Sequence, residues 1–280
     1  KLISGYDAML AEVGNKPERA ALLKDKGEVT AYQLHNSEKG KEILESALQV
    51  PGVDEQFKAS IKLLLGDVML GLGEIWDASL LYSQVDLDFK YDQLGEQAKF
   101  KNARLSYFTG DFDWAKAQLD VLKGATSKFI ANDALDLSLL ITDNSTIDTT
   151  TTPLKMYAES ELLILQNKLS EATQLLQQIL SRYPNHALSD EIAYQRYKIA
   201  FKKGDFALAE TELKQVLALG SEDILADNAL FSLAQLYDKY LKQPEKAQAT
   251  YKKLLTDYSD SFFTTPARKR FRELRGDNLN

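Results

Sequence analysis

The side chains that could carry chemistry are few in this sequence and lie far apart. The only two histidines are His35 and His186, and there is no cysteine, so neither a thiolate nor a histidine metal centre is expected. Acidic pairs such as Glu210 and Glu212 stand two residues apart and would lie on different faces of a helix, so they do not form a carboxylate pair for acid–base catalysis. No phosphate-binding glycine loop, His-Glu-x-x-His or Gly-x-Ser-x-Gly motif occurs. We therefore expect no catalytic residue, no cofactor and no metal, and a protein that is not an enzyme.

The composition narrows the classes of partner. The chain has 280 residues, 44% of them hydrophobic, which is ample for a buried core. Its formal net charge of −7 makes nucleic acid a poor partner, because the phosphate backbone is also negative. No apolar run approaches the roughly 20 residues of a membrane span. A protein or peptide remains the expected partner.

One stretch shows the elements from which the chain is built. Gly204 and Asp205 form a break, because glycine suits the left-handed residue after a helix and aspartate caps the next one. The small Ala209 leaves room for a neighbouring helix, and Leu213 and Val216 follow it by four and seven residues on the same face. This pattern predicts one helix ending and a second, packed helix beginning.

The same pattern occurs six times in the chain, and we call its small residue the anchor. The anchors are Gly40, Ala78, Ala115, Ala172, Ala209 and Ala247. The apolar residues four positions later are Leu44, Tyr82, Leu119, Leu176, Leu213 and Tyr251, and those seven positions later are Ala47, Val85, Leu122, Ile179, Val216 and Leu254. Five positions before the anchor stand His35, Gly73, Gly110, Asn167 and Gly204, whereas Lys242 does not fit. The anchors are 38, 37, 57, 37 and 38 residues apart, so the third interval is one period plus twenty residues.

These positions predict an all-α array of helical hairpins without strands. The expected pairs are Glu18–Leu34 with Ser37–Val50, Asp54–Leu72 with Ile75–Asp86, Gly95–Thr109 with Phe112–Leu122, Leu154–Gln166 with Ser170–Arg182, Ser189–Lys203 with Phe206–Leu219, and Asp223–Tyr240 with Pro244–Tyr258. The twenty extra residues are expected to form a helix over Lys128–Thr142 and a polar loop over residues 143–153. Phe262–Arg275 is expected to cap the array. Leu2–Val13 is expected to be the second helix of an interrupted hairpin, so the chain would begin within a repeat.

The repeat resembles the tetratricopeptide repeat (TPR) family over nearly the whole chain. Ser160–Pro184 and Ile192–Ser221 match well, and the ends Leu180–Asn185 and Leu255–Asp260 are similar to unit ends in bacterial envelope TPR proteins. The period exceeds the usual 34 residues, and the tryptophan near the start of the first helix is missing. The resemblance implies one domain over residues 1–280, a right-handed α-α superhelical solenoid of about six hairpins with one extra central helix and a C-terminal capping helix.

The resemblance also implies where a partner would bind. In this family the first helix of each hairpin lines a concave groove that holds a peptide or helix of another protein. On that basis the groove candidates are Arg104, Tyr107, Tyr157, Tyr194 and Lys198. Tyrosine and arginine are enriched in binding hot spots; the alternative is that these side chains only pack helix on helix. The resemblance implies a scaffold or adaptor, and suggests a periplasmic or otherwise extracytoplasmic setting, in the assembly of a bacterial envelope complex. Two other functions stay open, a self-associating structural subunit and an enzyme on an α-helical toroid.

Overall fold

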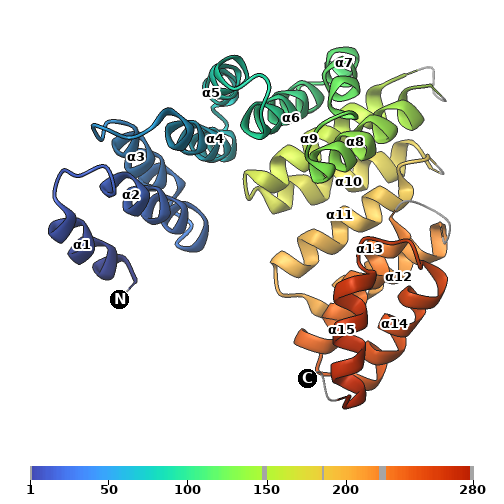
Figure 1. The fold of residues 1–280 in the computed structure, drawn as a ribbon. Helices are drawn as coiled ribbons and strands as arrows, with labels where there is room; N and C mark the ends of the chain where they lie inside the picture. The colour runs from blue at the N-terminus through green and yellow to red at the C-terminus, as the bar shows by residue number, and fades with distance from the viewer. Residues whose placement is uncertain (1, 147–149, 185, 221–224, 278–280) are drawn as a thin grey trace. The chain divides into compact units, whose positions relative to one another are not determined.

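The computed structural model describes residues 2–146, 150–184, 186–220 and 225–277, and every regular element in them is helical (Figure 1). The chain divides into two compact units, Lys1–Lys168 and Leu169–Asn280, which we call unit 1 and unit 2. That residues 1–280 form a single repeat domain remains a prediction.

The helices follow the predicted order along the chain. Unit 1 contains α1 (Leu2–Val13), α2 (Arg19–Glu28), η1 (Val29–Gln33), α3 (Ser37–Leu48), α4 (Glu55–Leu72), α5 (Ile75–Asp88), α6 (Gln93–Phe108), α7 (Phe112–Leu122), α8 (Lys128–Thr146) and α9 (Thr152–Leu165). Unit 2 contains α10 (Leu169–Arg182), α11 (Ser189–Lys202), α12 (Phe206–Leu219), α13 (Ala226–Gln235), η2 (Leu236–Tyr240), α14 (Pro244–Asp257) and α15 (Thr264–Arg275).

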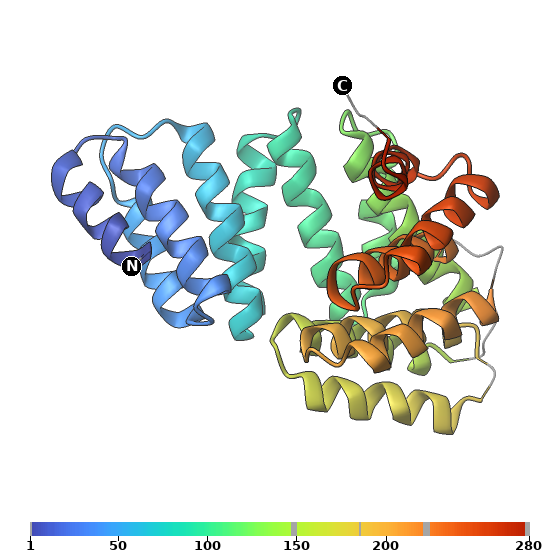
Figure 2. The ribbon, with the colours of Figure 1, turned by 90° about the horizontal axis from the view of Figure 1, so that it is seen from below.

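Within each unit, helices that are consecutive in the chain pack against one another. In unit 1 each helix from α1 to α8 contacts the next one, and α9 contacts α4, α6 and α8. Figure 2 shows the helices from blue to green lying side by side in chain order. In unit 2 the same succession runs from α10 to α15, where α15 covers α14. The all-α array of helical hairpins is therefore confirmed, as is the terminal helix.

The aligned positions of the repeat form the core. All six anchors are buried, and so are the residues four and seven positions after each of them. Gly40 has a particular reason to be glycine, since a Cβ atom there would lie 2.6 Å from the Cβ atom of Ala31 on the preceding helix. The helices of that hairpin thus approach more closely than an alanine would permit.

The residue five positions before the anchor has a positive φ in all six repeats. The four glycine or asparagine positions have φ between 59° and 88°, and His35 and Lys242 have φ of 53°. The expectation that Lys242 departs from the pattern was therefore wrong, because its backbone takes the same left-handed turn. The residue type alone did not reveal the positive φ at position 242, since lysine rarely adopts that conformation.

His35 and Lys242 both follow a π-helical turn. In the four other repeats the N–H of the residue after the left-handed position bonds to the carbonyl oxygen five residues back, as for Asp205 and Ala200. After His35 and Lys242 the equivalent bond reaches six residues back, from Asn36 to Thr30 and from Gln243 to Tyr237. One residue is inserted in the last turn, so the single helices expected over Glu18–Leu34 and Asp223–Tyr240 end as η1 and η2. Residues 223 and 224 lie outside the described residues.

The polar stretch after Thr142 is partly helical rather than a loop. Helix α8 continues to Thr146, and α9 already begins at Thr152. The hydroxyl of Thr142 donates to the carbonyl of Ser138 at 2.7 Å, and the amide of Asn144 donates to that of Leu140 at 2.9 Å. These short polar side chains bond back to their own helix and so do not end it. Residues 147–149 of the predicted loop lie outside the described residues.

Replacing Lys242 by glycine should stabilise the fold. A non-glycine residue in the left-handed region costs about 1 kcal/mol or more, and glycine removes that strain. We expect the free energy of unfolding of Lys242→Gly to rise by up to about 1 kcal/mol, measured by urea unfolding followed by circular dichroism. Lys203→Gly is the matched control, since Lys203 has a φ of −80° and should only lose stability. Equal losses in both variants would contradict the assignment.

Candidate interaction surfaces

Two of the predicted groove residues lie inside the helix layers of unit 1. Tyr107 on α6 is 1% exposed and Tyr157 on α9 is 3% exposed. The hydroxyl of Tyr107 donates to Oε2 of Glu161 at 2.8 Å, and its ring lies against Phe108 and Phe112. Both tyrosines therefore contribute to packing, the alternative that the sequence left open, and neither presents its ring to a partner.

Arg104 lies at the surface of α6. Its side chain is half-buried, and the guanidinium carbon is 5.2 Å from the centre of the Phe108 ring. Gln93, Gln97 and Lys101 precede Arg104 by eleven, seven and three residues, so all four share one face of the helix. This α6 face runs from carboxamides at its N-terminal end to cations at its C-terminal end.

A groove of about 560 Å³ lies beside the N-terminal ends of α4 and α6. Its lining residues are polar apart from one aromatic and one aliphatic side chain. They are Asp54, Gln56, Phe57, Ser60, Asp92, Gln93, Leu94 and Gln97. Helices α4 and α6 are the first helices of consecutive hairpins and contact each other. We call this hollow and the adjoining α6 face the α4–α6 groove.

A partly buried polar bridge connects the two helices of this groove. Asp67 on α4 accepts a hydrogen bond from the hydroxyl of Tyr82 at 2.8 Å and from Nζ of Lys101 on α6 at 2.7 Å. Burial and the Asp67 carboxylate raise the pKa of Tyr82, so its hydroxyl keeps the proton that it donates. Gly66 must be glycine here, because a Cβ atom would lie 2.4 Å from the Tyr82 ring. The Asp67 carboxylate of α4 thus joins α5 through Tyr82 and α6 through Lys101.

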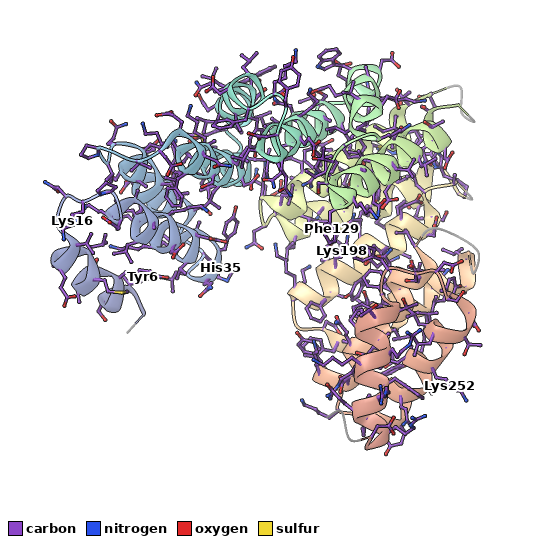
Figure 3. All side chains as sticks on the ribbon, viewed as in Figure 1. Tyr6, Lys16, His35, Phe129, Lys198 and Lys252 are labelled. Carbon is purple, nitrogen blue, oxygen red and sulfur yellow. The ribbon has the colours of Figure 1, made fainter. Side chains whose placement is uncertain are left out.

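Tyr194 and Lys198 belong to a row of aromatic side chains in unit 2. The Lys198 ammonium is 4.7 Å from the centre of the Tyr194 ring, and Lys198 is exposed on α11 (Figure 3). Tyr197 and Phe201 continue the row along α11. The ring centres of Tyr194 and Tyr197 are 5.5 Å apart, and those of Tyr197 and Phe201 are 6.1 Å apart. Tyr240, the last residue of η2, packs edge-on against Phe201 at 4.8 Å and is partly exposed. We call this row the α11 aromatic surface.

The turn that carries Tyr240 is anchored by a second polar contact. The hydroxyl of Tyr237 donates to Oε1 of Glu210 at 2.8 Å, and Nζ of Lys214 lies 2.6 Å from the same oxygen. The Lys214 hydrogen bond lowers the pKa of Glu210, and the Tyr237 hydroxyl acts in the same direction against the opposing effect of burial. Glu210 therefore ties α12 to η2 as a carboxylate.

The sequence pointed to Arg104, Tyr194 and Lys198 but not to the groove itself. Gln56, Phe57, Gln93 and Gln97 were missed, although Gln93, Gln97 and Lys101 are spaced by four residues. That spacing on a first helix was a usable indication of an exposed polar face. Residue type did not single out the carboxamides, because glutamine is not among the residues enriched in binding hot spots. Within the described ranges no three metal-binding side chains lie together, and no helix there is long and apolar enough to cross a bilayer.

The geometry defines a class of protein, an array of helical hairpins with small residues at the helix crossings. The profile of the family described as "Tetratricopeptide repeat" matches residues 156–186 and 228–261. These two segments of the chain, one ending just after α10 and one running from α13 to just after α14, are thus tetratricopeptide repeats by their sequence. A search among curated proteins gives no match.

Several solved structures are similar at low identity. A tetratricopeptide repeat protein from Parabacteroides merdae is 14% identical, with 98% of this chain and 91% of that chain covered and a TM-score of 0.39. The C-terminal part of a TPR repeat-containing protein from Cytophaga hutchinsonii is also 14% identical, with 95% and 92% covered and a TM-score of 0.36. PilF of Pseudomonas aeruginosa is 13% identical, with 92% and 98% covered and a TM-score of 0.34.

Removing the Tyr107 hydroxyl should destabilise unit 1 without touching a binding surface. Tyr107→Phe deletes the donor to Glu161, and we expect the free energy of unfolding to fall by about 1 kcal/mol in urea unfolding. Tyr91→Phe is the control, since Tyr91 is 91% exposed and should change stability by less than about 0.5 kcal/mol. An unchanged Tyr107→Phe variant would show that the hydrogen bond contributes nothing.

The Glu210 contact predicts a pH dependence. Because its pKa is lowered in the folded state, Glu210 stabilises the fold above the ordinary glutamate pKa of about 4.3, and this contribution is lost as the pH falls through the folded value. The wild type should therefore be more stable than Glu210→Gln at neutral pH, and the difference should shrink as the pH falls from about 5 to 3. Lys214→Met should show the same convergence in urea unfolding. Parallel curves for wild type and Glu210→Gln would contradict this role.

Proposed function

We propose that the protein is a non-enzymatic interaction scaffold that holds an extended segment of a partner protein in the α4–α6 groove. Tetratricopeptide repeats support the general role of protein binding. The observation that carries the finer proposal is the groove itself, because it combines carboxamides, a hydroxyl, Phe57 and Leu94 in one open hollow.

The side chains of the groove suit a peptide main chain. Gln56, Gln93 and Gln97 each offer a donor and an acceptor, which match the N–H and C=O groups of an extended segment. The two aspartates are already engaged as helix caps, since Asp54 accepts from the N–H of Phe57 at 2.8 Å and Asp92 from that of Leu94 at 2.8 Å. The carboxamides are therefore the groups left for the ligand, and Phe57 and Leu94 cover an apolar side chain.

Arg104 gives the groove a direction. It lies two turns beyond Gln97 on the α6 face, and its cation would attract an acidic group of the partner. The α11 aromatic surface, with Tyr194 and Lys198, is the corresponding contact surface of unit 2 in this proposal. In its more specific form, the proposal places the scaffold in the assembly of a bacterial envelope complex.

Site-specific photo-crosslinking in the source cell tests the groove. We expect p-benzoylphenylalanine at Gln97 to give a discrete crosslinked product, because Gln97 lines the groove. The same group at Lys252, which is exposed on α14 (Figure 3), is the control and should give none. Products at both positions, or at neither, would contradict groove binding.

The crosslinked partner then permits a quantitative test. Phe57→Ala should weaken its affinity about thirtyfold, the effect of a hot-spot residue worth about 2 kcal/mol. Phe262→Ala is the matched control, since Phe262 is an exposed phenylalanine outside the groove, and its dissociation constant should equal that of the wild type. Equal affinities for all three proteins, measured by calorimetry, would place the partner elsewhere.

A further inference from the structure

Both tryptophans of the chain lie exposed on unit 1. Trp76 on α5 is 83% exposed and Trp114 on α7 is 59% exposed. Helices α5 and α7 both pack on α6, and Figure 1 shows them on the same side of it. Large aromatic side chains are the residues most enriched in binding hot spots, so two exposed tryptophans on neighbouring hairpins call for a physical explanation.

The tryptophans are part of a larger apolar stripe. Leu80 and Leu87 follow Trp76 by four and eleven residues, which places all three on one face of α5. On α7, Val121 follows Trp114 by seven residues on one face. We call these side chains, together with Tyr91 after α5, the α5–α7 surface; all of them are classed as exposed. The exposed apolar side chains thus follow one face of α5 and one face of α7.

The helix between α5 and α7 gives these side chains no cover. Its polar residues bond to the flanks instead, since Asn102 accepts from the hydroxyl of Ser79 at 3.3 Å and donates to that of Ser83 at 3.2 Å. On the other flank, the amide of Gln118 on α7 donates to the hydroxyl of Ser106 at 3.1 Å. Between α5 and α7, these polar side chains of α6 therefore have hydrogen-bond partners on the flanking helices, and the exposed apolar side chains lie on α5 and α7 to either side.

The charges around this surface have one prevailing sign. The exposed carboxylates on α5, on α7 and beside them are Asp77, Asp88, Asp92, Asp111, Asp113 and Asp120. The exposed cations over the same stretches are Lys90 and Lys123, of which Lys123 pairs with Asp120 at 2.7 Å and Lys90 lies over the Tyr91 ring. An apolar stripe with an acidic rim favours a basic ligand and disfavours an anionic lipid surface.

We propose that the α5–α7 surface docks a basic amphipathic helix of another protein. The helical spacing of the exposed side chains suits the apolar stripe of such a helix, and the rim carboxylates would pair with its lysines or arginines. This site lies on different helices from the α4–α6 groove, so it is a second binding site and does not depend on the proposed function.

Intrinsic fluorescence reads this surface directly, because the chain has no other tryptophan. The probe is a synthetic amphipathic peptide of leucine and lysine, about 18 residues or five helical turns long. We expect it to shift the tryptophan emission to shorter wavelength in a saturable way, with an affinity that falls as salt is added. A peptide of the same composition, scrambled so that it has no apolar face, and a peptide with glutamate in place of lysine should bind at least about tenfold more weakly.

Matched variants locate the binding. Leu87→Asp should weaken the basic peptide at least about tenfold, whereas Leu208→Asp, at an exposed leucine of α12 in unit 2, should leave its dissociation constant unchanged. Circular dichroism confirms that both variants are folded. Crosslinking at Gln97 in the α4–α6 groove should be unaffected by Leu87→Asp, so the failure of one proposal leaves the other standing.

Four outcomes would overturn the proposal. Equal binding of the basic, scrambled and acidic peptides would show non-specific hydrophobic contact, and equal effects of both leucine variants would place the peptide elsewhere. A tryptophan shift produced by phosphatidylserine vesicles but not by the peptide would indicate a lipid surface. A concentration-dependent dimer in sedimentation that is lost in Leu87→Asp would show that a second copy covers the surface.

Discussion

The close approach of neighbouring helices at six small residues is the constraint on which the rest of the fold depends. A single hairpin cannot bury its own apolar face, so each must place that face against the next. The anchors permit this because they let two backbones come together, as at Gly40, where even a methyl group would collide with Ala31. Once the crossing is fixed, the side chains four and seven residues later fall into the core.

Hydrogen-bonded polar side chains then fix the relative positions of helices that otherwise contact one another only through apolar side chains. In unit 1 Asp67, Tyr82 and Lys101 join three consecutive helices. In unit 2 Asp238 accepts two hydrogen bonds from the Arg270 guanidinium on α15, at 2.7 and 2.8 Å. Burial, with the nearby Asp238 carboxylate, raises the pKa of Tyr251 to about 12. The bridge in unit 1 explains why the second repeat has Tyr82 where four of the other repeats have leucine.

Much of the fold was predictable because it depends on local spacing. The anchor pattern fixed which helix faces are buried, and the glycine or asparagine five residues earlier marked where helices end. The sequence failed where a side chain overrode its usual preference. Lys242 takes a left-handed turn that its type disfavours, and Thr142 and Asn144 bond back to α8 although such residues usually indicate a loop.

The interaction surfaces were harder to predict, because exposure depends on neighbours distant in the sequence. Tyr107 and Arg104 are three residues apart on α6, yet one is buried against Glu161 and the other lies at the surface. Helix α9 packs on α6 and supplies the Glu161 carboxylate that accepts from Tyr107, which the spacing along α6 alone does not reveal. The α4–α6 groove likewise arises only when two helix beginnings from successive hairpins are brought together.

The π-helical turns at η1 and η2 have a consequence for how such an array can change in length. Each takes up one surplus residue within a single turn, and the next helix still starts from the same left-handed backbone as in the other hairpins. A residue inserted at this point is held within the π-helical turn itself, so the helices that follow keep the faces that they bury. The end of a first helix is therefore the place where a repeat of this kind can gain a residue without losing its stacking.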